Sequence, residues 1–155
     1  MTAHLVEVML RPTGQLYVQV LSASANRIWS VDGLPTVLDS GTSSIDLGAA
    51  VLGALEKSTF GLVEDPTPFD LPSQSPLLAW AGVKTWSTYN RDCRIIQVRA
   101  DYDHGSPTTV ILTPQARDRT GGYSPLSGLR KRDVDATDPA ELGTAILLSL
   151  QDATA

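Results

Sequence analysis

The sequence predicts an α+β fold, in which an antiparallel or mixed β-sheet is built from two similar β-β-(β)-α halves, each with its own covering helix. Three observations predict it: paired β-rich runs, two capped amphipathic helices, and a match between the halves at a nearly constant offset. The halves span about 1–58 and 92–155, and a connector at 59–91 joins them. We expect a single domain over residues 1–155, because this length is enough for one ordinary core.

Two hairpins are expected from β-forming runs that flank turn residues. The first pairs residues 5–10 with 16–21 across an Arg-Pro-Thr-Gly turn, and Glu7 is the exception within its run. The second pairs residues 93–100 with 108–113 across an Asp-His-Gly-Ser-Pro turn. Weaker strands are expected at residues 27–31, 35–38 and 129–134.

Each hairpin is followed by a helix with a recognisable start. Ser43 is the expected N-cap of a helix that ends at Lys57, because its hydroxyl can accept from the free amides of the first turn. Asp138, with Pro139 and Glu141 after it, has the same role for residues 139–152. Gly48 is a poor helix former and therefore indicates close packing of the first helix on a sheet.

The two helical segments match each other residue by residue. An offset of about 95 places the cap Ser43 on Asp138 and Leu47-Gly48 on Leu142-Gly143, while the hairpins need an offset of about 90. We interpret the match as an internal repeat of two units, neither of which is large enough to bury its apolar face alone.

The connector changes character along its length. Residues 59–76 hold four prolines, with Glu64, Asp65 and Asp70 between them, and are expected to be extended and not packed. A short helix is expected from residue 76. The aromatic residues in and after the connector are interpreted either as a partner-binding patch or as core, and the core is favoured for the first two: Trp80, Trp86, Tyr89 and Tyr123.

Composition and charge restrict the classes of function. Hydrophobic residues make up 42% of the chain and charged residues 19%, which is typical of a globular protein, and the net charge is −5. An acidic surface argues against nucleic acid as a direct partner and suits a basic protein partner. The lone Cys93 can form neither an internal disulfide nor a zinc cluster, so a buried thiol is expected, with no cofactor and no metal. No segment has the apolar length of a membrane span or a signal peptide, which predicts a soluble cytoplasmic protein.

One short motif suggests an alternative activity. Residues 37–42 read Val-Leu-Asp-Ser-Gly-Thr, as in the loop that holds the catalytic carboxylate of an aspartic protease. Two such aspartates must face each other, and the second half has no carboxylate at the position that matches Asp39, so this reading requires a homodimer. A loop and N-cap explain the same residues. Because no nucleophile-and-base or phosphate-binding motif is present either, we predict that the chain is not an enzyme.

Several short motifs then occur in a characteristic order. They are a Gly-Val-Lys-Thr-Trp segment at 82–86, Tyr89, a hairpin that ends at Thr113-Pro114, Gly121-Gly122-Tyr123, and a closing helix with Leu142-Gly143. This order resembles the immunity proteins (CdiI) of bacterial contact-dependent growth inhibition systems. Thr85 stands where the family has Ser, and Tyr89 where it has Phe.

The resemblance implies a single immunity-protein domain that inhibits without catalysis. Such a protein binds the C-terminal toxin domain of CdiA (CdiA-CT), often a nuclease, in the cytoplasm, and blocks its active site or an adjacent surface. Acidic side chains would then steer association with a basic cleft. The candidate toxin contacts are Glu64, Asp65 and Asp70 in the connector and Asp101 and Asp103 in the second hairpin.

Overall fold

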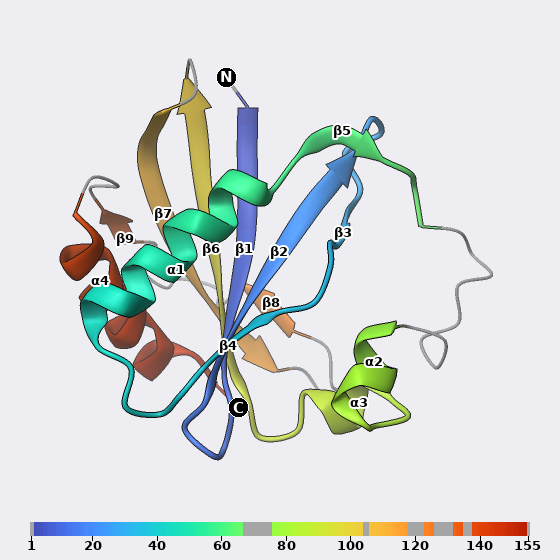
Figure 1. Cartoon of the computed structure of the whole chain (residues 1–155), viewed down its shortest axis with the longest axis vertical. Helices are drawn as coiled ribbons and strands as arrows, with labels where there is room; N and C mark the ends of the chain where they lie inside the picture. Colours follow the sequence, from blue (N-terminus) through green and yellow to red (C-terminus); the bar gives the residue numbers. More distant parts are fainter. Residues whose placement is uncertain are drawn as a thin grey trace.

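The computed structural model describes residues 2–66, 76–103, 106–117, 123–125, 132–134 and 138–154. In these segments the chain forms a nine-stranded sheet in the order β3-β2-β1-β6-β7-β8, with β4 and β5 paired to β2 and β9 paired to β7 (Figure 1). The strands are β1 (Thr2–Leu10), β2 (Leu16–Ser24), β3 (Trp29–Val31), β4 (Thr36–Leu38), β5 (Phe60–Val63), β6 (Arg94–Asp103), β7 (Ser106–Arg117), β8 (Tyr123–Pro125) and β9 (Arg132–Val134).

The two hairpins share one sheet because their first strands pair with each other. β1 runs antiparallel to β2 and to β6, so that Val6 lies between Val20 and Val98. Among the pairings within the described chain, β2–β5 is parallel and the others are antiparallel. The sheet curls into a half-barrel, and the predicted α+β class is confirmed.

Two long helices, α1 (Ser44–Lys57) and α4 (Pro139–Asp152), lie together on one face of the sheet (Figure 1). Both predicted N-caps are confirmed: the Ser43 hydroxyl accepts from the Asp46 amide at 3.2 Å, and the Asp138 carboxylate accepts from the Ala140 amide at 3.0 Å. The helices and the alternate strand residues that face them form the main core. Its fully buried members include Val6, Val8, Leu47, Val51, Leu55, Ile96, Val98, Leu112, Leu142 and Ile146.

The two helices cross at the matched glycines. A Cβ on Gly48 would lie 2.6 Å from the carbonyl carbon of Pro139, and a Cβ on Gly143 would lie 2.6 Å from the carbonyl carbon of Ser44. Gly48 thus allows close packing, but against the other helix and not against the sheet, so the predicted partner was wrong. The contacts are reciprocal at the offset of the sequence match, while an origin as an internal repeat stays a prediction.

Two segments contain strands where the sequence indicates none: the connector, expected to be extended and not packed, and residues 114–128, expected to form a polar loop. β5 lies in the connector and pairs with β2, where the Ala23 amide donates to the Thr59 carbonyl at 2.9 Å. β7 continues to Arg117, and β8 pairs with its end. The expectation of unpacked segments was wrong because these short strands are formed by pairing with distant strands, which local composition does not show.

A second, smaller core lies on the opposite face of the sheet, under α2 (Pro76–Ala81) and α3 (Trp86–Tyr89) (Figure 1). The Arg11 side chain fixes α3 in place: it donates to the Tyr89 carbonyl and lies over the rings of Tyr17 and Tyr89. The core residues are Met9, Leu77, Leu78, Tyr89, Cys93 and Ile95, which confirms Cys93 as a buried thiol.

Of the two tryptophans for which the core was favoured, only Trp86 packs partly against the smaller core. Trp80 is 41% exposed and meets the ring of Tyr17 edge-on at 5.7 Å, so that expectation was wrong for Trp80.

Candidate functional site

The face of the sheet opposite α1 and α4 is only partly covered, and we call it the open face. Side chains alternate along each strand, so the odd-numbered residues of β1, β2, β6 and β7 point away from the main core. A cavity of about 760 Å³ lies over them. Its floor and walls, which include β3 and β8, are lined by Leu5, Glu7, Leu21, Trp29, Ser30, Val31, Gln97, Arg99, Asp101, Ile111, Thr113 and Pro125.

A row of polar residues crosses the middle of the open face. Gln19 on β2 pairs in register with Glu7 on β1, Glu7 with Gln97 on β6, and Gln97 with Thr113 on β7. Glu7 and Gln19 each interrupt an otherwise largely apolar strand. A sheet face needed only for packing gains nothing from such a row, because polar groups taken out of water cost free energy unless they are hydrogen-bonded.

Glu7 is the charged member of this row. Burial raises the pKa of its carboxyl above the ordinary value, and a hydrogen bond from the Gln97 side chain opposes that shift. Among the residues that the structure describes, no basic side chain forms an ion pair with Glu7; the neighbouring Arg99 instead pairs with Asp101 at 3.4 Å. The carboxylate is therefore desolvated without a countercharge.

Gln19, beside Glu7, is also incompletely satisfied. Its side chain is only 6% exposed, and its Nε2 donates to the Val20 carbonyl at 3.0 Å and the Gly33 carbonyl at 3.2 Å. Within the described parts of the chain, its Oε1 is buried without a hydrogen-bond donor. A buried acceptor left in this state costs about 1–3 kcal/mol.

Glu7 and Gln19 both line a smaller cavity of about 230 Å³ beside α3, which we call the aromatic pocket. Tyr17, Trp86 and Tyr89 form much of its wall, and burial raises the pKa of Tyr89 to about 12. A carboxylate without an ion-pair partner among the described residues, one unsatisfied amide oxygen and several aromatic rings favour a ligand that is cationic and rich in N–H donors. The remaining lining residues are Met9, Val31, Leu77, Asn90, Ile95 and Tyr123.

Among the acidic residues predicted from sequence to contact a toxin, those whose side chains the structure describes lie near one end of the sheet. Asp101 lines the open-face cavity and also an end cavity of about 500 Å³, which it shares with Trp29, Arg27 and Phe60. Phe60 begins β5, and the connector acids Glu64 and Asp65 follow that strand and are exposed.

The other acidic candidates are less informative. Asp65 accepts from the Asn26 side chain at 2.6 Å, and hydrogen bonds from Ser24 and Asn26 lower the pKa of its carboxyl. Asp103 ends β6, and its side chain is not described; Asp70 lies outside the described residues. The structure thus brings Asp101 to the same end of the sheet as the start of β5.

The aspartate of the protease-like motif lies elsewhere. Asp39 is exposed in the turn between β4 and α1, where its carbonyl accepts from the Thr42 amide at 3.0 Å and from the Thr42 hydroxyl at 2.8 Å. These bonds are those of a turn that leads into the Ser43 cap. In the described segments no three His, Cys, Asp or Glu side chains are grouped to hold a metal ion, and no helix is long and apolar enough to span a membrane.

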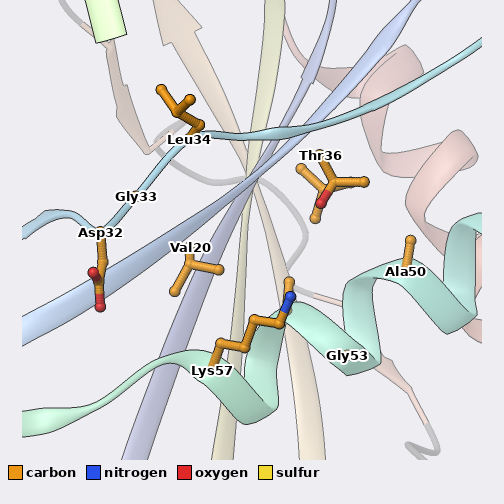
Figure 2. Close-up of a pocket in the computed structure, with 10 residues that line it drawn as sticks. Val20, Asp32, Gly33, Leu34, Thr36, Ala50, Gly53 and Lys57 are labelled. Atoms are coloured by element: carbon orange, nitrogen blue, oxygen red, sulfur yellow. The ribbon is translucent and has the colours of Figure 1, made fainter. Parts of the chain in front are cut away.

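A lateral groove of about 480 Å³ separates α1 from the segment between β3 and β4 (Figure 2). Asp32 and Lys57 lie on opposite sides of it, and the helix side is formed by small residues such as Ala50 and Gly53. Asp32 is already engaged, since it accepts from the Ser22 hydroxyl at 2.6 Å. The groove brings together few polar groups that could bind a ligand. The open face is therefore the stronger candidate for the functional site.

Sequence reasoning missed the central residues of the open face. The available signal was the polar residue in the middle of each of three β-forming runs: Glu7, Gln19 and Gln97. Only the strand register shows that the three are neighbours.

No protein-family model and no curated protein sequence matches the chain. Solved structures do: a chain of the CdiA-CT/CdiI toxin and immunity complex from Yersinia pseudotuberculosis superposes with a TM-score of 0.72 at 19% identity, covering 99% of both chains. The chain has a CdiI-like fold. A protein of unknown function from Neisseria meningitidis has the same fold, with a TM-score of 0.73 at 17% identity over 98% of this chain and 96% of that one. The CdiI-like fold agrees with the resemblance found in the sequence motifs.

Proposed function

We propose that this chain is an immunity protein, which binds the toxin domain of a contact-dependent growth inhibition system and neutralises it. The observation that carries the proposal is the match over 99% of the chain to a chain of a toxin and immunity complex. A match of that extent includes the curled sheet, both helices and the open face, and is not limited to one common motif.

The proposed mechanism is inhibition by binding, in the cytoplasm and without catalysis. We place the toxin on the open face and the adjoining end of the sheet, where cavities, an unsatisfied carboxylate and exposed apolar side chains occur together. The net charge of −5 suits a nuclease toxin, because a cleft that binds nucleic acid is basic. The toxin would then be blocked at its active site or beside it.

The proposal is tested by growth. Cells that express the toxin domain encoded beside this gene should stop growing, and co-expression of this chain should restore growth and yield a co-purifying complex. A toxic domain that this chain neither rescues nor binds would refute the proposal. A specific peptidase activity abolished by Asp39→Asn would instead favour the aspartic protease.

The acidic candidates give a second prediction, about the rate of association. Neutralising Glu64, Asp65, Asp70, Asp101 and Asp103 together should slow toxin binding about 10-fold at low salt, because steering by charge is lost, and less at high salt. The control neutralises five exposed acids elsewhere, with the same change in net charge: Asp39, Asp46, Glu56, Asp133 and Glu141. Stopped-flow association rates for both variants decide. Equal slowing in both would show that only net charge matters.

A further inference from the structure

We propose that the toxin inserts one lysine or arginine side chain into the aromatic pocket, where Glu7 and Gln19 accept its N–H donors. This inference rests on the proposed function and names the chemistry of the partner at the open face. The proposed occupant is a side chain of a protein partner, because the pocket shares Glu7 and Val31 with the open-face cavity of about 760 Å³, on which the toxin is placed.

Two acceptor groups in the pocket can take further hydrogen bonds. The Glu7 carboxylate has no countercharge among the described residues, and the Gln19 Oε1 has no donor there. An ammonium group brings three donors and a guanidinium five, so either can satisfy both acceptors at once. A neutral apolar side chain in the same place would leave the Gln19 Oε1 without a donor and Glu7 without a countercharge, and would bind poorly.

The aromatic wall of the pocket also favours a cation. Tyr17, Trp86 and Tyr89 line it, and a cation close to aromatic faces is attracted by the electrons of the rings. Two of these rings already attract a cation within the protein, because the Arg11 guanidinium lies 5.1 Å from the Tyr17 ring centre and 5.3 Å from that of Tyr89. Arg11 does not line the pocket, so it does not occupy the place assigned to the toxin side chain.

Ion pairing should make binding depend on pH in a defined direction. Burial raises the pKa of Glu7 in the free protein, and an inserted cation lowers it, so binding releases a proton between the two values. The affinity should therefore rise with pH across that interval and level off above the pKa of free Glu7. The other titratable or charged groups around Glu7 and its pocket, among the described residues, are Arg11, Tyr17, Tyr89, Cys93, Arg99, Asp101 and Tyr123.

Calorimetric titration of the toxin domain encoded beside this gene tests the inference, with the intact chain at pH 5 to 8. Glu7→Gln keeps the size and the polarity of the side chain and removes the charge. We expect it to weaken binding about 30-fold or more at pH 8 and to abolish the rise of affinity with pH. Glu56→Gln, an exposed acid on α1, is the matched control and should bind like the wild type.

The stability of the free protein separates a binding role from a folding role. A carboxyl whose pKa is raised by folding destabilises the folded state as pH rises through that pKa. Glu7→Gln should therefore raise the melting temperature at pH 8 and leave it nearly unchanged at pH 4. A variant that is at least as stable as the wild type and binds more weakly supports the inference. Carboxyl NMR of labelled Glu7 should show its pKa falling in the complex.

The outcomes distinguish the inference from the function on which it rests. If wild type and Glu7→Gln bind the toxin equally at every pH, the inserted cation is refuted while the immunity function stands. If Arg99→Gln, and not Glu7→Gln, removes the pH dependence, the effect comes from the Arg99–Asp101 pair and the cation inserted at Glu7 is refuted. If the wild type binds no toxin, both proposals fail together.

Discussion

Gly48→Ala should destabilise the protein by about 3 kcal/mol, because the added methyl group has no space between α1 and α4. The new Cβ would lie 2.6 Å from the carbonyl carbon of Pro139 and 2.9 Å from its Cα. These are backbone atoms, which no rotamer change can move. The helices would have to separate, and the layer that contains Leu47 and Leu142, both fully buried, would lose its packing.

The matched control is Gly53→Ala on the same helix. A Cβ there has no heavy atom within 4 Å, because Gly53 faces the lateral groove (Figure 2). The substitution should stabilise the protein by about 0.5–1 kcal/mol, through the better helix propensity of alanine. Urea unfolding of both variants measures the difference. Two alanine variants of equal stability would show that the helix crossing is not as close as the structure has it.

Ser58→Ala should cost about 2–4 kcal/mol, because one hydroxyl joins three elements in the interior. The Ser58 Oγ accepts from the Leu5 amide on β1 at 3.0 Å and donates to the Leu21 carbonyl on β2 at 2.5 Å. Ser58 is also the C-cap of α1, and it is buried. Alanine would leave a backbone donor and a backbone acceptor without a partner in a region that water does not reach.

Ser149→Ala is the control for this prediction. Ser149 is equally buried in α4, but within the described residues its Oγ has no hydrogen-bond partner. Removing that hydroxyl should be neutral or slightly stabilising, since alanine is also the better helix former. Thermal unfolding at one pH compares the two variants. If the free energy of unfolding of Ser58→Ala lies within about 0.5 kcal/mol of the wild-type value, the Leu5 amide and the Leu21 carbonyl must find other hydrogen-bond partners.

Local signals in the sequence were enough to predict the two hairpins, the two long helices and the N-caps of those helices, but not α3. The Ser43 and Asp138 caps act within three residues, so no knowledge of the rest of the chain was needed. The partner of Gly48 could not be predicted in this way, because Pro139 is distant in sequence and a small residue shows close packing without showing against what.

The open face was beyond local reasoning for the same reason. Glu7, Gln19 and Gln97 are each a polar residue in the middle of a β-forming run, and only the β2–β1–β6 register aligns them. The acidic candidates, such as Asp65 and Asp101, follow from charge alone and not from the family pattern. Exposed charge is visible in a sequence, whereas a buried carboxylate without a countercharge is visible only once the strands are paired.

The central claim is that this CdiI-like chain binds a toxin through its open face. Titration calorimetry with the toxin domain encoded beside the gene tests it most directly, with the wild type and an open-face variant, Leu5→Arg, whose folding is checked by circular dichroism. We predict a saturable complex with a dissociation constant on the order of nanomolar for the wild type, and a loss of about 100-fold or more for the folded variant. A wild type that gives no binding heat and forms no complex on gel filtration would contradict the claim.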